Sequence, residues 1–449
     1  MNFDINIDPL VWICLAVAAL ASLLAFWTRF IPIWYAGSAV DTTTYDSDSD
    51  SDSEEASEDQ GEPEYETAQE EKEAEVATVN EDSNESEDIQ TITEEPPAID
   101  DKSASNVESY PKLSVIVYAY TEFEETKKYL EMLMSQDYPN FEVILINEGS
   151  ADTLGILQER MGNQYDNLYI TFIPHDAHNL SRRKLAYTIG MKAASGEIAL
   201  TTASNCLIPS RRWLSEMMLP FVEDGTIDIV LGYSHIDFRE LRGAGKWYRQ
   251  MDATLTACQW IGSAQMGKPY RGDCFNLAYR RELFFQQKGY SRTIHLVNGD
   301  DDIFLTPIMD GYNTAVAISP DTILTTEWDE VANRVLASTK ERYQFTSQLL
   351  PQTPFIRAGI GSLMQWLILL SAVGAALAAL PSYLGIIIAA VFLIIVWTSE
   401  ILIYRRAARR LESICLWWSF PFFLLWLPIG NFIFKTRRRS QRRKNYTFA

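Results

Sequence analysis

The chain of 449 residues has few cysteines and histidines for its length. Its five cysteines are scattered without a Cys-x-x-Cys pair, which argues against a disulfide framework and is typical of a reducing compartment. Among the four histidines, His175 and His178 are three residues apart and could form a metal pair. They stand in a polar connection with no further His or Cys nearby, so two solvated loop histidines are the other interpretation.

Basic residues are missing from the first eight positions, MNFDINID, which argues against a cleaved secretory signal peptide. The apolar run that follows is long enough to cross a bilayer, and we predict an uncleaved transmembrane anchor over residues 10–35. Trp27, Trp34 and Tyr35 are expected at the membrane–water interface. Arg29 follows the run while acids precede it, a pattern that predicts an outward-facing N-terminus.

Basic and apolar residues are scarce between Asp41 and Asp101, where twenty-five acidic residues accompany the single Lys72. The formal charge of −22 therefore belongs to this segment, and the rest of the chain is close to neutral. Dense like charge with little apolar surface cannot bury a core, so residues 36–109 are predicted to be a disordered tether. A self-repelling spacer and a segment that binds cations or proteins are the two interpretations of its role.

Long apolar runs return in the C-terminal part of the chain. Two of them are joined at Pro381-Ser382, and we predict a transmembrane hairpin over residues 360–404. Four arginines follow directly, at positions 405, 406, 409 and 410. By the positive-inside rule these arginines mark a cytoplasmic end.

A third apolar run, within residues 411–434, contains Pro421 and Pro428. Basic clusters on both sides of this run indicate that it re-enters the membrane or lies in the interface, although a third span is the alternative. The basic tail at 435–449 is expected in the cytoplasm. Its arginines suit anionic membrane lipids, and we expect no nucleic-acid partner.

Between the membrane segments, strand-like and helix-like stretches alternate. At this spacing they predict an α/β domain whose mainly parallel sheet is covered by helices, over residues 110–327. Beyond the first two strands, the predicted strands are 168–174, 197–203 and 227–232, and the predicted helices are 180–194 and 211–222.

The first two strands carry the most informative residues. KLSVIVYAY, from Lys112, is followed after a helix by FEVILINEGSAD, a βαβ arrangement. Open α/β sheets bind ligands beyond the carboxyl ends of their strands. We therefore expect Tyr118, Tyr120, Asn147 and Glu148 to meet at one rim of the sheet.

These two blocks resemble the opening of inverting family 2 glycosyltransferases. NLSRRKLAYTIGMKAASGEIALTTASNC, GKPYRGDCFNLAYRRELFFQQKGY and NGDDDIF follow in the order of that family and resemble its membrane-bound bacterial members. The resemblance implies a GT-A fold, nucleotide-diphospho-sugar transferase-like, with one N-terminal and two or three C-terminal membrane helices. It implies transfer of a sugar, with inversion, from a nucleotide-sugar donor to a lipid-linked or polysaccharide acceptor. A multi-pass protein of the inner (cell) membrane with a cytoplasmic catalytic domain is expected.

The resemblance also implies roles for single residues. Glu148, with Tyr118, Tyr120 and Asn147, would hold the nucleotide, whereas otherwise Glu148 is an exposed turn residue. Asp302 matches the family's catalytic base and Asp301 is its neighbour, an arrangement of like charges that raises one pKa. The structural alternative for both acids is capping of a helix.

Two cations are candidates for neutralising the donor diphosphate. Arg342 matches the family's leaving-group motif, but it is alternatively a solvated charge on an amphipathic interfacial helix, predicted over residues 328–350. Lys184 could offset diphosphate charge without metal, or could belong to a solvated helix start.

A carboxylate pair for a metal ion is absent from the position where the family has one. The family's Asp-x-Asp falls on Ala203-Ser204-Asn205. Asn205 could supply one neutral oxygen to Mg²⁺ or Mn²⁺, and a loop without a metal role is the alternative. Loss of both carboxylates keeps a second function open, a catalytically inactive membrane scaffold or binding protein of the same fold.

Overall fold

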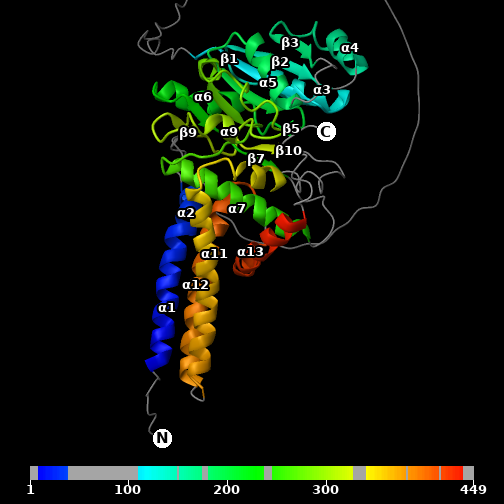
Figure 1. Ribbon diagram of the computed structural model, residues 1–449. Coiled ribbons are helices and arrows are strands. Elements are labelled where there is room, and N and C mark those ends of the chain that lie inside the picture. The colour runs from blue at the N-terminus through cyan, green and yellow to red at the C-terminus, as the bar shows by residue number, and fades with distance from the viewer. Residues whose placement is uncertain are drawn as a thin grey trace, which may run out of the picture. The chain divides into compact units, whose positions relative to one another are not determined.

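The computed structural model describes residues 9–38, 110–148, 151–173, 181–236, 245–326, 340–380, 383–413 and 416–437 (Figure 1). These residues fall within one compact unit. Several predicted features lie outside them: residues 39–109 of the tether, 328–339 of the amphipathic helix, 438–449 of the basic tail, and both His175 and His178.

The main sheet has seven strands in the order β3-β2-β1-β4-β8-β6-β9. They are β1 (Leu113–Ala119), β2 (Phe141–Asn147), β3 (Leu168–Phe172), β4 (Ile198–Ala203), β6 (Ile229–Leu231), β8 (Leu277–Arg280) and β9 (Thr314–Val316). The first four strands are parallel, as predicted, and β9 is parallel to β6. β8 runs antiparallel to both β4 and β6, so the sheet is mixed. This reversal brings the residues before β8 to the same edge as the residues after β4.

A second, smaller sheet lies beside the first. Its three strands are β5 (Cys206–Leu207), β10 (Leu324–Thr326) and β7 (Ser234–Ile236), in the order β5-β10-β7. β10 is parallel to β7 and antiparallel to β5. Since β5 follows β4 after two residues, this sheet extends the rim at which β4 ends.

The two faces of the main sheet bury different sets of helices. Side chains alternate along β1, so Val115 and Val117 face one layer while Ile116 and Tyr118 face the other. The first layer contains α3 (Phe123–Met134), α4 (Ala151–Arg160) and α6 (Trp213–Glu223). The second contains α5 (Arg182–Ala193) and continues into α7 (Gly245–Gln265) (Figure 1).

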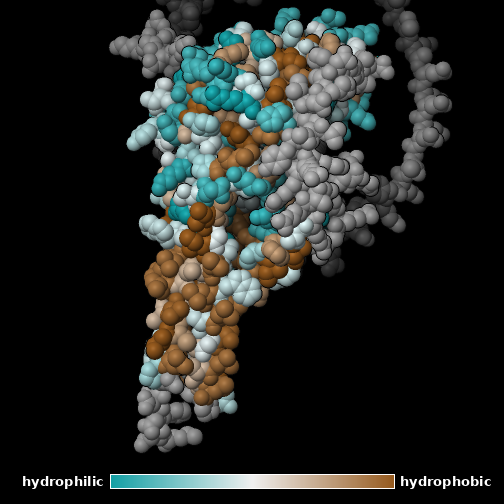
Figure 2. Space-filling model, viewed as in Figure 1, coloured by the Kyte–Doolittle hydropathy of each residue, from teal (hydrophilic) through white to brown (hydrophobic). Residues whose placement is uncertain are grey.

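Four helices in the described part of the chain are long and apolar enough to cross a membrane. The first is a continuous run of α1 (Pro9–Ala25), a π-helical turn η1 (Phe26–Phe30) and α2 (Ile31–Ser38). The predicted hairpin forms α11 (Thr353–Ala378) and α12 (Tyr383–Arg410). Figure 2 shows apolar residues covering these helices, in contrast to the polar sheet domain. So large an exposed apolar surface supports association with a membrane.

The third apolar run does not form a re-entrant turn. After a short 3₁₀ turn, η2 (Trp417–Ser419), it continues as one helix, α13 (Phe420–Arg437), which includes Pro428. Pro421 lies in the first turn, where a missing N–H has no helical partner to lose. The two prolines therefore do not divide the segment into two helices, and its place in the membrane or at the interface stays a prediction.

The sheet domain and the long apolar helices share one hydrophobic core. Ile33 of α2, Trp260 of α7, Tyr404 of α12 and Phe420 of α13 all belong to the cluster that reaches β1. A Cβ atom at Gly262 would lie 1.8 Å from the carbonyl oxygen of Pro32, so glycine allows α2 and α7 to touch through their backbones. The N-terminal helix is thus packed onto the domain.

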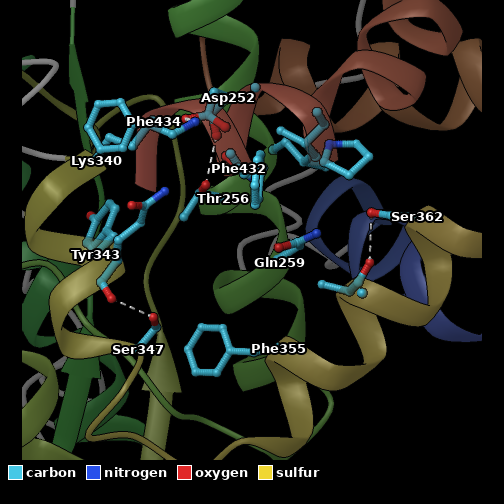
Figure 3. Close-up of a pocket in the computed structure, with 18 of the residues that line it drawn as sticks. Asp252, Thr256, Gln259, Lys340, Tyr343, Ser347, Phe355, Ser362, Phe432 and Phe434 are labelled. Carbon is cyan, nitrogen blue, oxygen red and sulfur yellow. Dashed lines mark hydrogen bonds and ion pairs between the residues drawn. The ribbon is translucent and has the colours of Figure 1, made fainter. Parts of the chain in front are cut away.

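A pocket of about 880 Å³ remains between the domain and the long apolar helices (Figure 3). Asp252, Thr256 and Gln259 of α7 form one side. Residues 340–346, which are helical, form another side with the residues that follow them, and α11 and α13 complete the walls.

Candidate functional site

The predicted rim forms at the carboxyl ends of β2, β1 and β4. Ala119 of β1 pairs with Asn147, and Tyr118 pairs with Ala203 of β4, so the chain leaves all three strands at one edge. The Tyr118 and Tyr120 ring centroids are 5.2 Å apart. Tyr120 is exposed there, whereas Asn147 is buried. The structure therefore brings the four residues together, with Tyr120 more accessible than Asn147.

Glu148 is fixed at this rim by its backbone and its side chain. Its N–H donates to the carbonyl oxygen of Ala119 at 2.7 Å, which joins the exits of β1 and β2. Its carboxylate forms an ion pair with Arg182, the first residue of α5. Glu148 is therefore not a free turn carboxylate, and a ligand that uses it would contact Arg182 as well.

Lys184 differs from both interpretations of the sequence. It is fully buried, and its Nζ donates to the carbonyl oxygens of Thr293 at 2.7 Å and Asn298 at 2.9 Å. Burial lowers its pKa to about 8. Lys184 thus holds the 293–298 segment in place, and its charge is not directed at a diphosphate.

The residues at the family's metal position do not fit a metal ion. The Ala203 side chain has no donor atom, and the Ser204 hydroxyl is 2.7 Å from that of Thr121. Asn205 offers one amide oxygen, while its own amide nitrogen is buried without a hydrogen-bond partner among the described residues. Within that part of the chain, no group of three His, Cys, Asp or Glu side chains could hold a metal ion. A single neutral oxygen is a weak ligand set for Mg²⁺ or Mn²⁺.

The segment before β8 forms the opposite side of the rim. The Cys274 carbonyl oxygen accepts from Thr201 Oγ1 of β4 at 2.9 Å and from the Tyr187 hydroxyl of α5 at 3.3 Å. Asp273 is buried and accepts from Ser234 N–H of β7 at 3.0 Å and from the Ser234 hydroxyl. These hydrogen bonds connect the two sheets at the point where Cys274 faces the acidic residues 300–302.

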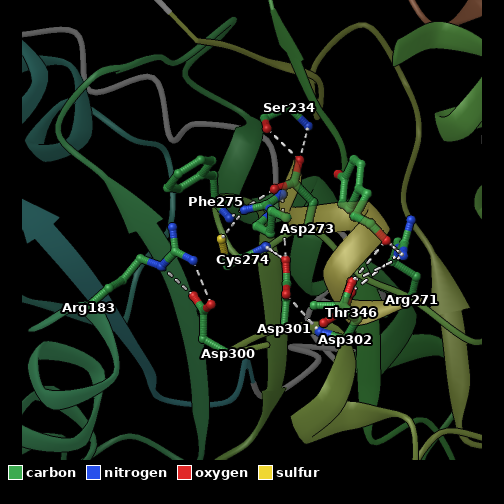
Figure 4. A network of polar contacts seen from close by, with 12 residues as sticks. Arg183, Ser234, Arg271, Asp273, Cys274, Phe275, Asp300, Asp301, Asp302 and Thr346 are labelled. Carbon is green, nitrogen blue, oxygen red and sulfur yellow. Dashed lines mark hydrogen bonds and ion pairs between the residues drawn. The ribbon is translucent and has the colours of Figure 1, made fainter. Parts of the chain in front are cut away.

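Three consecutive buried aspartates, Asp300, Asp301 and Asp302, each face a different arginine (Figure 4). Asp300 forms a two-point pair with Arg183, with Nε and Nη2 each 2.6 Å from a carboxylate oxygen. Asp301 Oδ2 lies 3.8 Å from Arg342 Nη2. Asp302 Oδ2 lies 3.4 Å from Arg271 Nε.

The aspartates also begin a short helix. Asp301 is the N-cap of α9 (Asp302–Leu305), and its Oδ1 accepts from the Asp302 N–H at 2.8 Å. Its Oδ2 accepts from the Cys274 N–H at 3.4 Å. The capping interpretation therefore holds for Asp301, and the catalytic role of the two acids stays a prediction.

The pKa values of the two neighbouring carboxyl groups are shifted in opposite directions. Burial alone raises the pKa of Asp301, but the Arg342 and Arg183 charges more than offset it, so its pKa lies below the ordinary value. For Asp302, burial and then the Asp301 charge raise the pKa to about 7, against a smaller lowering by Arg271. Pairs of acids whose pKa values are pushed apart serve as distinct acid and base groups in enzymes. Asp302 can exchange a proton near neutral pH.

Arg342 is not the solvated charge that one interpretation expected. Its side chain is buried, its guanidinium lies over the Tyr343 ring at 4.8 Å, and Nη1 donates to Cys274 Sγ at 3.5 Å. Nε has no hydrogen-bond partner among the described residues. Arg342 therefore lies between the rim and Asp301.

Arg271 was not predicted from the sequence. It is buried, stacks over the Tyr343 ring at 4.2 Å and donates to Thr346 Oγ1 at 3.3 Å. Arg271 and Tyr343 also line the 880 Å³ pocket, so the arginine partner of Asp302 is part of its wall. The sequence offered one signal for Arg271, its position four residues before Phe275 in the RGDCFN block. That block does not reveal which acid the Arg271 side chain contacts.

Residues 114–284 match the family described as Glycosyl transferase family 2, a range that runs from β1 into α8 (Arg281–Gln286). Among curated proteins, the chain is similar to Glycosyltransferase AglE from Haloferax volcanii, with 29% identity over 124 residues. That match covers 27% of this chain and 39% of the relative, so the chain matches about two fifths of the relative's length.

Two solved structures are similar at lower identity. Mannosyltransferase PcManGT from Pyrobaculum calidifontis, in complex with GDP-Man and Mn²⁺, is 18% identical, with a TM-score of 0.42 over 68% of this chain and 88% of that chain. Glucosyl-3-phosphoglycerate synthase from Mycobacterium tuberculosis, solved with Mn²⁺ and UDP, is 16% identical, with a TM-score of 0.34 over 56% and 86%. Both TM-scores are below 0.5, so neither likeness bears on what this chain binds.

Proposed function

Because residues 114–284 match Glycosyl transferase family 2, we propose that the chain is a membrane-bound glycosyltransferase. It would move a sugar from a nucleoside diphosphate to a lipid-linked or polysaccharide acceptor, with inversion of the anomeric centre. The observation that carries this proposal is Asp302, a buried acid with a pKa of about 7 whose arginine partner lines a pocket against the membrane helices.

On the donor side, the proposal assigns the nucleotide to the rim. Tyr118 and Tyr120 offer aromatic surface, Asn147 lies at the end of β2, and Glu148 offers carboxylate oxygens beside Arg182. A carboxylate in this position would accept hydrogen bonds from ribose or base.

The leaving diphosphate would be stabilised by Arg342. Its guanidinium lies between the rim and Asp301, and its Nε keeps a donor without a partner among the described residues. Stabilising charge that develops in the transition state is a large part of enzymatic catalysis. In the family a metal ion supplies that charge, but the residues at Ala203-Ser204-Asn205 do not fit one.

On the acceptor side, Asp302 would take the proton of the attacking hydroxyl. A single displacement needs a base on the face opposite the leaving group. With its pKa raised to about 7, Asp302 is partly deprotonated at neutral pH and can still hold the proton that it receives. Asp301, whose pKa is lowered, stays charged and keeps Arg342 in place.

In this proposal the long apolar helices would hold the chemistry at a lipid surface. The exposed apolar residues of α1, α11 and α12 would face acyl chains, and the four arginines between 405 and 410 would lie at the cytoplasmic boundary. We propose a multi-pass protein of the inner (cell) membrane whose sheet domain is cytoplasmic, where nucleotide sugars are available.

A second function is favoured by one observation, the missing carboxylates at Ala203-Ser204-Asn205. A membrane scaffold that keeps the fold and binds a partner or glycan without catalysis would not need them. Such a protein would not need a general base that titrates near neutral pH. The two functions therefore share one fold and differ in whether the protein transfers sugar.

Donor titration tests the proposal. Purified full chain is expected to bind one of the UDP-, GDP- or TDP-sugars, with equal affinity in EDTA and in excess Mn²⁺, because Ala203-Ser204-Asn205 offers no carboxylate to a metal. Glu148→Gln is expected to weaken this binding by about tenfold, the loss of one charge-assisted hydrogen bond. Isothermal titration of each nucleotide sugar measures both effects.

Glu197→Gln is the matched control, because Glu197 is also paired with an arginine, Arg280, but lies away from the rim. No binding of any nucleotide sugar would contradict the glycosyltransferase proposal. Binding that appears only with Mn²⁺ would contradict the metal-independent part alone, and binding without turnover would favour the scaffold.

A further inference from the structure

Arg29 is buried among the membrane helices, yet part of its guanidinium has no partner. Its exposed fraction is 2%, and Nη2 donates to the Ala358 carbonyl oxygen at 2.8 Å and to the Ser362 hydroxyl of α11. Nε and Nη1 have no hydrogen-bond partner among the described residues. Buried charged donors are costly when they are unsatisfied, and ionisable residues within membrane helices mark ligand or ion sites.

No acid in the described part of the chain forms an ion pair with Arg29. The acid whose charge acts on it is Glu400 of α12, and Glu400 Oε2 instead accepts from Gln365 Nε2 at 3.0 Å. The positive charge of Arg29 is therefore not neutralised by a direct contact.

The backbone around Arg29 is unusual as well. Arg29 belongs to η1, a π-helical turn inside a long helix, and such turns are frequent at functional sites. A Cβ atom at Gly361 would lie 2.9 Å from the Arg29 Cβ atom, so α11 leaves room for the arginine where the two helices meet.

Arg29 lines the 880 Å³ pocket together with apolar side chains, of which Figure 3 labels Phe355 and Phe432. A further pocket residue, Tyr248, has a buried hydroxyl without a hydrogen-bond partner among the described residues. The apolar wall consists of Phe355, Leu363, Trp366, Leu427, Ile429 and Phe432. Unsatisfied donors beside a hydrocarbon surface match a ligand with an anionic head and an apolar chain.

We propose that this pocket binds the phosphate-bearing head of a lipid, with Arg29 as its anion-binding residue. The inference rests on the proposed function and specifies its acceptor as a glycan joined to a hydrocarbon chain through phosphate. Arg29 holds the phosphate, and the apolar wall holds the beginning of the chain. The glycan hydroxyl extends toward Asp302 along the wall that contains Arg271. The N-terminal helix is then part of the acceptor site as well as an anchor.

The test measures binding of hexadecyl phosphate and of hexadecanol to the full chain in neutral maltoside micelles. The wild-type protein is expected to bind the phosphate at least about tenfold more tightly, since charge-assisted hydrogen bonds have that magnitude. Arg29→Gln is expected to remove this preference while leaving hexadecanol binding unchanged, and Arg29→Lys to keep part of it.

Arg357→Gln is the matched control. Arg357 is an arginine of α11 that donates to the Trp27 carbonyl oxygen and does not line the pocket, so general attraction of anions would be lost equally in both variants. Gly359→Leu fills the pocket from a position where a Cβ meets nothing within 4 Å, and it is expected to weaken both amphiphiles. Equal binding of the two amphiphiles by the wild type, or equal losses in Arg29→Gln and Arg357→Gln, would overturn the proposal.

Nucleotide-sugar binding, measured on the same preparations, separates this proposal from the proposed function. Arg29→Gln should leave it unchanged, which also shows that the variant folds. Arg29-dependent phosphate binding in a protein that binds no nucleotide sugar would sustain the lipid site and overturn the transferase. Nucleotide-sugar binding without a preference for the phosphate amphiphile would sustain the transferase and overturn the lipid site.

Discussion

Replacing Asp302 by Asn is expected to lower the kcat of sugar transfer by about 10²- to 10⁴-fold, the contribution of a general base. The amide has nearly the size of the carboxyl group but cannot accept the acceptor's proton. Donor affinity should stay close to that of the wild type, because Asp302 contacts Arg271 and begins α9, away from Glu148 and Arg182. Single-turnover transfer from a saturating labelled donor measures the chemical step directly.

Two further variants sharpen this result. Asp302→Glu keeps a carboxylate but moves it by one methylene, so its loss should be smaller than that of Asn. Asp310→Asn is the matched control, because Asp310 is an exposed turn acid after α9 whose Oδ1 accepts from the N–H groups of Tyr312 and Asn313. If Asp302→Asn transfers sugar at the wild-type rate, Asp302 is not the base.

Replacing Arg183 by Met is expected to lower the free energy of unfolding by about 3–5 kcal/mol, the usual cost of removing one partner of a buried pair. The Asp300 carboxylate has no exposed surface, and Arg183 contacts both of its oxygens. Without the guanidinium, Asp300 must stay charged and unpaired or take up a proton. Denaturant unfolding of the full chain in mixed micelles measures the loss.

A double-mutant cycle shows whether the loss comes from the pair. Arg183→Met combined with Asp300→Asn should be less destabilised than the sum of the single variants, because the uncompensated charge is gone. Arg212→Met is the control, since Arg212 pairs with Asp321 at the surface, where such pairs contribute about 0–1 kcal/mol. Additive losses in the cycle would mean that Arg183 stabilises the fold through packing alone.

The fold could be predicted from the sequence where the hydrophobic pattern is strong. β1 and β2 are continuous apolar runs that end in polar residues, and a strand buried on both faces has that pattern. Their parallel pairing then brought Tyr120 and Glu148 to one edge, as the βαβ arrangement predicts. Residues 10–35 and 360–404 were recognised by length and hydropathy alone.

The partners of the charged residues could not be predicted. Lys184 looks like a solvated lysine at a helix start, and only the folded 293–298 segment turns it inward. Arg342 and Arg271 are 71 residues apart, yet both guanidinium groups stack on Tyr343. Such contacts depend on the antiparallel direction of β8, which a four-residue apolar run does not encode.

The pH dependence of kcat/KM for sugar transfer tests the assignment of Asp302 most directly. The base acts when deprotonated, and its pKa is raised to about 7, so activity should be complete above that pH and fall as the pH drops through it. Below the midpoint, kcat/KM is expected to fall about tenfold per pH unit, and Asp302→Asn should abolish this limb. A profile that is flat between about pH 5 and 9, or a limb that persists in Asp302→Asn, would contradict the account.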